Sequence, residues 1–277
     1  MGIVQVIDVI DESEKIYLIM ELMTGGNLLS KVVQEEGLCE SNVKLIAKSL
    51  LLGVRHLHEQ EICHNGLEPS NIFLDATDGA KIGDFGHASR VGSMASSPGT
   101  AAYMAPEVLQ GAAPNAASDM WSIGVLLYFC LSGRTPFVDQ SSAASSRTNV
   151  SRIHKADYSF PTTEWKHVPR YAKQLISSLI HMDPTVRLTA EEALEHPWFA
   201  DPVVVPAQYR RQPRRLRAVV QFLFEKMSLC RKSKKDVKVL ASLSTSSSSP
   251  YSVQSIKHGH RREQSTSSTN WFYDIDG

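Results

Sequence analysis

The alternation of apolar and polar residues at the start of the chain predicts two strands. Residues 3–10 (IVQVIDVI) and 16–22 (IYLIMEL) are rich in β-branched residues, which favour extended backbone. The polar segment 11–15 lies between them and is typical of a turn. We therefore expect these two runs to pair as antiparallel strands.

After this strand pair the hydrophobic period becomes helical. Apolar residues recur at spacings of three and four over 28–33 and again over 43–57, which predicts two helices. Short strands are expected at 72–74 and 81–82, and further helices around 120–131, 171–181 and 190–195. The Ser-, Gly- and Ala-rich segment 89–101 predicts a loop, and the Ser-rich segment 140–148 a mobile insertion or weak helix. The pattern as a whole favours an α+β protein that is mainly helical.

The composition changes beyond residue 202. Residues 210–238 carry 11 Lys and Arg against two acidic residues, whereas residues 1–209 carry 15 basic and 24 acidic residues. The sequence therefore predicts an acidic body over 1–199, a linker over 200–209 and a basic amphipathic helix over 210–240. The Ser- and Thr-rich remainder, 241–277, is expected to stay disordered.

The remaining composition excludes several classes of protein. The longest apolar stretch, 121–131, is too short for a transmembrane helix, and acidic residues interrupt the N-terminal segment where a signal peptide needs an apolar run. Four scattered cysteines indicate neither a zinc site nor a disulfide scaffold. A protein of the cytoplasm, or of the nucleus, is expected. Nothing in the balanced charge of the whole chain indicates a nucleic-acid partner.

Six ordered motifs give the chain a specific resemblance. They are HNGLEPSN at 64–71, DFG at 84–86, GTAAYMAPE at 99–107, DMWSIG at 119–124, DPTVR at 183–187 and HPW at 196–198. Together they resemble the protein kinase family, most closely its serine/threonine, calcium/calmodulin-dependent group. The resemblance implies a protein-kinase-like fold over 1–199, with a helical C-lobe over 25–199 and a truncated β N-lobe over 1–24.

The resemblance also implies roles for individual residues. ATP and Mg²⁺ are the cofactors of the family, and Asn71 and Asp84 match its metal-binding positions. The residues facing the nucleotide would be Met20, Glu21, Met23, Asn71 and Asp84. Structural roles are implied for His64, Phe85, Gly86, Glu107, Asp119 and Arg187. An alternative for Asn71 and Asp84 is that they only hydrogen-bond the loop backbone.

The catalytic loop departs from the family pattern at three positions. Gly66 stands where the family has the Asp that accepts the substrate hydroxyl proton, a contribution of about 10²–10⁴-fold. Glu68 replaces the loop lysine that faces the γ-phosphate, which reverses the charge there. Asn65 replaces the arginine that pairs with a phosphorylated activation loop.

These departures lead to two alternative functions. The leading interpretation is a catalytically impaired, pseudokinase-like protein that acts as a binding or scaffold module. We also expect the glycine-rich loop, the ATP-binding lysine and its partner glutamate to be absent, since the family places them before the strand that begins at Ile3. The alternative is an active, ATP-dependent serine/threonine kinase represented by a truncated chain.

The basic segment could bind a partner. Leu216, Leu223 and Leu229 lie at positions 1, 8 and 14, a spacing that calmodulin targets use, with basic residues on both sides. Calmodulin or another acidic partner is therefore expected at 210–238. Docking of the segment on the acidic body and binding to an anionic membrane surface remain alternatives.

Overall fold

The computed structural model describes residues 2–13, 15–93, 99–137 and 146–200, together with the backbone of two short strands further along the chain. The strands are β1 (Val6–Asp11), β2 (Lys15–Glu21), β3 (Ile62–Cys63), β4 (Ile72–Leu74), β5 (Ala80–Ile82), β6 (Ser89–Arg90), β7 (Asp236–Ser242) and β8 (Tyr273–Asp274). The α-helices are α1 (Leu28–Glu35), α2 (Glu40–Glu59), α3 (Pro106–Leu109), α4 (Ala116–Ser132), α5 (Ser146–Ile153), α6 (Thr162–Trp165), α7 (Arg170–Leu179) and α8 (Ala190–Leu194). Short 3₁₀ turns are η1 (Pro69–Asn71), η2 (Ala101–Tyr103) and η3 (Pro197–Phe199).

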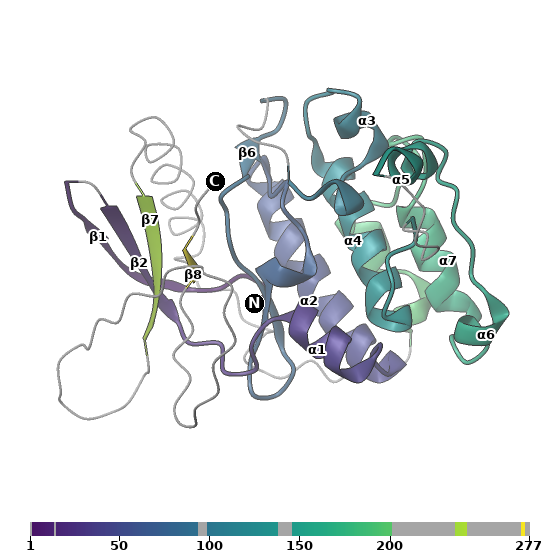
Figure 1. The fold of residues 1–277 in the computed structure, drawn as a ribbon, viewed down its shortest axis with the longest axis horizontal. Helices are drawn as coiled ribbons and strands as arrows, with labels where there is room; N and C mark the ends of the chain where they lie inside the picture. Colours follow the sequence, from purple (N-terminus) through teal and green to yellow (C-terminus); the bar gives the residue numbers. More distant parts are fainter. Residues whose placement is uncertain are drawn as a thin grey trace.

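The arrangement confirms the expected α+β fold with a mainly helical large lobe. Figure 1 shows the β1–β2 hairpin on one side of the molecule and the helices α1 to α7 on the other. β1 and β2 pair antiparallel, as their sequence pattern predicts, from Val6 opposite Met20 to Asp11 opposite Ile16. Two further antiparallel pairs, β3 with β6 and β4 with β5, lie next to α2. None of the helices in the described residues is long and apolar enough to cross a membrane.

The helical lobe packs around α4, which is buried along nearly its whole length. Asn115 begins this helix with a capping box: its side chain accepts from the backbone N–H of Ser118, and the Ser118 hydroxyl accepts from the N–H of Asn115. The helix ends at Gly133, whose φ of +70° favours glycine. Because α4 contacts α2 on one side and α7 on another, it is the central element of the large core.

A second, smaller core joins the hairpin to the helical lobe. Ile16 and Leu18 of β2 are buried there together with Leu57 of α2 and with Phe85, which belongs to the DFG segment. Burial of such side chains contributes about 1.5–3 kcal/mol each. The hairpin is therefore positioned by direct contact with the segment that carries Asp84.

The strand β7 shows that one prediction from the sequence is wrong. Residues 236–240 were expected to end the basic helix 210–240, and 241–277 to stay disordered, yet 236–242 form a strand parallel to β2. Tyr273–Asp274 forms β8, which pairs antiparallel with β7. The linker 200–209 beyond Ala200, the segment 210–235 and the expected anchors Leu216, Leu223 and Leu229 lie outside the described residues.

The reason for this strand lies in the edge of β2. Without a neighbour, β2 would present a row of unpaired N–H and C=O groups on that side. The register places Val237 beside Ile16 and Val239 beside Leu18, so the alternation of apolar residues in the tail matches that of the hairpin. A helical period over 210–235 does not exclude extended backbone immediately after it.

The close approach of α4 and α7 gives the first testable prediction. A Cβ atom at Gly124 would lie 2.8 Å from Cγ1 of Ile180 and 2.9 Å from Cβ of Leu179. We therefore expect Gly124→Ala to lower the free energy of unfolding by about 1–3 kcal/mol, the usual cost of overpacking a core. Urea denaturation followed by circular dichroism would measure it. The double variant Gly124→Ala/Ile180→Ala should lose less free energy of unfolding than the sum of the losses in the two single variants. Strictly additive losses would contradict a steric origin.

Candidate active site

The carboxylate of Asp119, in the first turn of α4, anchors the loop that contains the expected catalytic residues. It is 1% exposed, and its Oδ2 accepts a hydrogen bond from the backbone N–H of His64 at 2.9 Å. Its Oδ1 accepts from the N–H of Asn65, also at 2.9 Å, and His58 Nε2 lies 3.0 Å from Oδ2. The start of the loop is therefore held by one buried side chain from a helix that follows it by more than 50 residues.

Asp119 remains ionised in this environment. Burial by itself would raise its pKa, but the hydrogen bond and charge of His58, together with the N–H of Asn65, more than offset that effect. The net pKa therefore lies below the ordinary value of 3.8. A negative charge is present where the two backbone N–H groups converge, which favours their orientation toward it.

His64 packs inside the protein rather than facing a substrate. Its ring is fully buried and contacts the ring of Phe85 edge-on, with centroids 4.9 Å apart. Nδ1 accepts from the N–H of Gly66 at 3.3 Å, so Nε2 carries the proton and donates to the carbonyl of Gly83 at 3.0 Å. Desolvation lowers the pKa of His64, which keeps the ring neutral. The ring links the catalytic loop to the DFG segment.

Gly66 is buried in the middle of the loop and offers no carboxylate. A Cβ atom here would lie 3.1 Å from Cδ2 of His87 and 3.6 Å from Nδ2 of Asn71. The residue does not have a positive φ, so its backbone conformation does not itself require glycine. The position can thus accept a side chain if His87 moves by a few tenths of an ångström. The absence of a proton acceptor is a matter of residue identity, not of backbone conformation.

Asn65 has a structural role that the sequence did not reveal. It adopts a left-handed conformation with φ of +60°, which asparagine tolerates better than most residues. Its Nδ2 donates to the carbonyl of His87 at 3.0 Å and to the hydroxyl of Ser89 at 2.8 Å. The amide therefore joins the catalytic loop to the start of the activation segment. The motif showed only that Asn65 stands where the family has an arginine, and gave no sign of these hydrogen bonds.

Glu68 and Asn71 lie at the end of the loop, around η1. The carboxylate of Glu68 accepts a hydrogen bond from the hydroxyl of Ser70. The carbonyl of Glu68 accepts from the N–H of Asn71 at 3.0 Å, and Asn71 Nδ2 donates to the carbonyl of Gly66 at 2.8 Å. The acidic side chain of Glu68 is therefore fixed close to the loop and remains partly exposed.

Asp84 lies beside Asn71, since the N–H of Gly83 donates to the carbonyl of Asn71 at 2.9 Å. Asp84 has φ of +50°, and its Oδ1 accepts from the N–H of Gly86 at 2.9 Å. Nδ2 of Asn71 and Oδ1 of Asp84 are thus engaged, so Oδ1 of Asn71 and Oδ2 of Asp84 are the oxygens that a ligand could use. Two oxygen ligands suit Mg²⁺, which takes its remaining ligands from phosphates and water. No cluster of three or more His, Cys, Asp or Glu suited to a metal occurs in the described part of the chain.

The other three residues expected to face a nucleotide, Met20, Glu21 and Met23, lie at the end of β2 and just beyond it. The carboxylate of Glu21 is 2.6 Å from Nζ of Lys81 and accepts from the N–H of Gln5 at 2.7 Å. Met20 packs against the smaller core, and Met23 is buried. Glu21 therefore ties the hairpin to β5, an ion pair that no motif indicated.

The activation segment is fixed to the large lobe by Glu107 and Arg187. The guanidinium group of Arg187 donates to both carboxylate oxygens of Glu107, at 2.6 and 2.7 Å, and to the carbonyls of Ala117 and His181. It also stacks 5.0 Å from the ring centre of Trp121. The structure thus brings together the pair implied by the resemblance. Such a buried pair fixes geometry more than it adds net stability.

The buried carboxylate of Asp119 yields a prediction about pH. Because its folded pKa lies below 3.8, Asp119 stabilises the fold above that pH, and this contribution is lost as the pH falls through the folded pKa. We expect Asp119→Asn to cost about 1–3 kcal/mol at pH 7, since buried donors lose an ionised acceptor. The variant should lose less stability than the wild type between pH 5 and pH 3, as measured by urea unfolding at each pH. An unchanged acid dependence would show that Asp119 is not the titrating group.

Known proteins are similar to this chain in sequence. The family model described as "Protein kinase domain" matches residues 1–199. Calcium/calmodulin-dependent protein kinase type 1 of Caenorhabditis briggsae is 37% identical over 204 residues, which cover 72% of this chain and 56% of that protein. A probable myosin light chain kinase of Dictyostelium discoideum is 37% identical over 199 residues, covering 70% and 56%. A calcium and calcium/calmodulin-dependent serine/threonine-protein kinase of Lotus japonicus is 35% identical over 203 residues, covering 71% and 38%.

The matches cover most of this chain but a smaller share of each relative. The chain spans little more than half the length of the first two of these relatives. The family match extends over both cores and all six motifs, including the loop held by Asp119. The chain therefore belongs to the protein kinase family, and the relatives that it matches include calcium/calmodulin-dependent protein kinases.

Proposed function

We propose that the protein is a catalytically impaired member of the serine/threonine kinase family that acts as a binding or scaffold module. The observation that carries this proposal is Gly66. Transfer to a serine or threonine hydroxyl needs a carboxylate that accepts the proton, and position 66 of the loop supplies none. The three atoms nearest to a Cβ placed at Gly66 belong to His87, Asn71 and His64, and none of them is a carboxylate oxygen.

Glu68 does not replace the missing base. Its carboxylate is two residues further along the loop and is engaged by the hydroxyl of Ser70. It also places a negative charge at the position where the family resemblance implies a lysine facing the γ-phosphate. The negative charge of Glu68 would repel the negatively charged phosphoryl group and so oppose its binding. Loss of the base and reversal of this charge act in the same direction.

The loop keeps features that support binding rather than turnover. The family uses ATP and Mg²⁺ in general, and Asn71 and Asp84 each retain one oxygen for a cation. If Mg²⁺ binds, it would neutralise phosphate charge beside these residues. Asn71 would also hold the loop through its bond to Gly66, and Asp84 through its bond to Gly86. We propose that any nucleotide bound in this way serves as a ligand and not as a substrate.

The decisive experiment compares phosphotransfer by the wild type, Asp84→Asn and Gly66→Asp/Glu68→Lys. The assay uses radiolabelled ATP with Mg²⁺ and a degenerate serine/threonine peptide mixture. We expect the wild type and Asp84→Asn to be equally inactive. Restoring the base and the loop charge should raise transfer by up to about 10²–10⁴-fold if the rest of the site is assembled. Transfer by the wild type that Asp84→Asn abolishes would overturn the proposal and favour an active kinase.

A thermal shift with Mg-ATP separates binding from turnover. A ligand present at about 100 times its dissociation constant stabilises a protein by about 2.7 kcal/mol, which is readily detected. A shift that Asp84→Asn removes would identify the protein as a nucleotide-binding scaffold. No shift would identify a scaffold that works without nucleotide.

We further propose that calmodulin, or a similarly acidic partner, binds at 210–238 in the cytoplasm or nucleus. The spacing of Leu216, Leu223 and Leu229 supports this, as do the names of two relatives, which describe those proteins as calmodulin-dependent. Binding should require calcium, and Leu223→Asp should weaken it by at least about tenfold, because an anchor would no longer enter the apolar groove. Isothermal titration of the full chain with calmodulin, with and without a calcium chelator, would measure this. Equal binding of Leu223→Asp would contradict it.

A further inference from the structure

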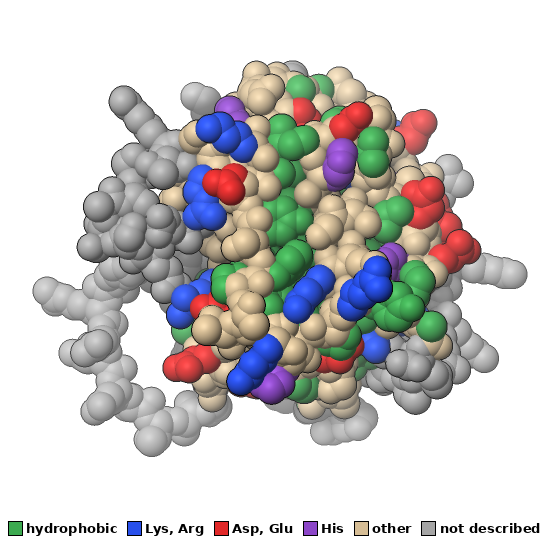
Figure 2. All heavy atoms as spheres, turned by 90° about the vertical axis from the view of Figure 1, so that its right-hand side faces the viewer, with side chains coloured by type: hydrophobic (Ala, Val, Ile, Leu, Met, Phe, Trp, Pro, Cys, Tyr) green, Lys and Arg blue, Asp and Glu red, His purple; other side chains and the backbone are tan. Residues whose placement is uncertain are grey.

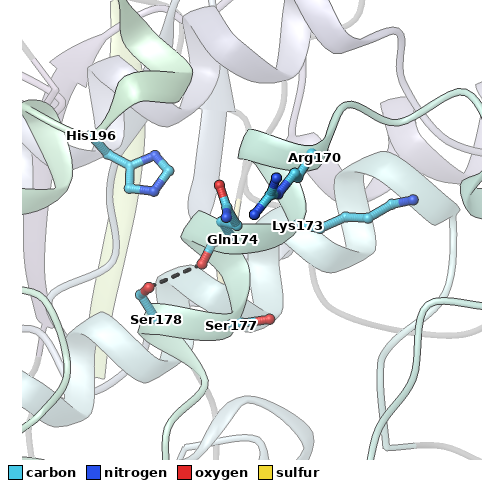
Figure 3. A pocket seen from close by; sticks show the side chains of 6 residues that line it. All are labelled: Arg170, Lys173, Gln174, Ser177, Ser178 and His196. Atoms are coloured by element: carbon cyan, nitrogen blue, oxygen red, sulfur yellow. Dashed lines mark hydrogen bonds between the residues drawn. The ribbon is translucent and has the colours of Figure 1, made fainter.

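A basic cleft lies on α7, on the opposite side of the large lobe from the hairpin. It is a cavity of about 500 Å³ lined by Arg170, Lys173, Gln174, Ser177, Ser178 and His196. The first five lie at spacings of three and four along α7 and so share one face of the helix, and His196 precedes η3. Figure 3 shows Arg170 and Gln174 together on α7, with the ring of His196 on the opposite side and Lys173 along the outer flank.

The side chains that line the cleft offer donors and no carboxylate. Arg170 and Lys173 have no acidic partner in the described part of the chain. Nδ1 of His196 accepts from the N–H of Trp198 at 3.2 Å, and burial lowers the pKa of this histidine. The neutral ring therefore carries its proton on Nε2, which is a donor. The Tyr158 hydroxyl lies 3.3 Å from Oγ of Ser177 and donates to it, which leaves the Ser177 proton for a ligand.

The α7 side of the cleft is locally basic on an acidic body, whereas the segment before His196 contains Glu191, Glu192 and Glu195. From Trp165 to Met182 the sequence contains Lys, Arg and His but no Asp or Glu, although residues 1–209 carry nine more acidic than basic residues. Figure 2, which views this side of the molecule, shows several Lys and Arg side chains on the face. Uncompensated cations on an acidic protein attract an anionic group, and Arg in particular matches the geometry of phosphate oxygens.

An exposed aromatic residue next to the cleft favours a peptide as the carrier of that group. Tyr171 is 52% exposed and lies three residues before Gln174, so the two are neighbours on the surface of α7. Tyr and Arg beside a pocket are the residues that most often carry binding energy in protein contacts. A free phosphate ion would not contact the exposed ring of Tyr171. A phosphorylated segment of a partner protein would cover both the cleft and the ring of Tyr171.

We propose that this cleft binds a phosphorylated serine or threonine carried by a partner protein. The phosphoryl group would lie between Arg170, Gln174 and His196, with Lys173 at its flank and the partner's backbone along Tyr171. The site is built from α7 and η3 and shares no residue with the catalytic loop, so it acts whether or not that loop transfers phosphate. It gives the proposed scaffold a second ligand: a product of phosphorylation.

The test uses the full chain and a degenerate peptide mixture with a central phosphoserine, compared with the same mixture carrying serine. Fluorescence anisotropy should show at least about tenfold tighter binding of the phosphorylated mixture. Arg170→Ala/Lys173→Ala should remove that preference. Lys155→Ala/Lys166→Ala, which removes two exposed cations outside the cleft, is the matched control and should bind within about twofold of the wild type.

Two further measurements complete the test: competition by inorganic phosphate, and binding of phosphoinositide-containing vesicles in place of the peptides. Inorganic phosphate at millimolar concentration should displace the phosphorylated mixture. Equal affinity for both mixtures, or an equal loss in the two double variants, would overturn the proposal. Binding of phosphoinositide-containing vesicles through Arg170 and Lys173, without binding of the peptides, would also overturn it and would assign the cleft to a membrane surface.

Discussion

One buried carboxylate determines the shape of the candidate active site. Asp119 accepts two backbone N–H groups from the loop that begins at His64, and His58 approaches it from the end of α2. The position of the loop is therefore fixed by α2 and α4, the two longest helices among the described residues, which pack together in the large core. Ordered loop geometry follows from this arrangement and does not depend on which residue occupies position 66.

This independence explains why the fold does not require a carboxylate at position 66. The two cores stabilise the fold, and the pair of Glu107 with Arg187 and the hydrogen bonds of Asn65 and His64 fix its local geometry. None of these uses a carboxylate at position 66. Glycine at position 66 is therefore compatible with an intact fold, and a surface such as the cleft on α7 does not depend on the residue at that position.

The sequence predicted the elements well wherever periodicity and motifs agreed. The hairpin, α2, α4 and α7 were evident from apolar spacing, because each buries one continuous face or, for α4, nearly every residue. The motifs also indicated which residues come together, as with Glu107 and Arg187, which are 80 residues apart. Contacts that the motifs do not specify were missed: those of His58, Asn65 and Lys81 depend on tertiary packing that no local pattern encodes.

The pairing of β7 with β2 has a consequence for regulation. The basic segment 210–238 and the strand 236–242 overlap at three residues, and those residues pair with Lys15, Ile16 and Tyr17. A partner that holds the segment as a helix as far as Lys238 must first break the pairing of these three residues with β2. Strand pairing and partner capture are then mutually exclusive at this point, so each weakens the other by the same factor. β2, the strand with which β7 pairs, has residues in the same small core as Phe85, so release of the tail exposes an edge of the hairpin that packs beside the segment carrying Asp84.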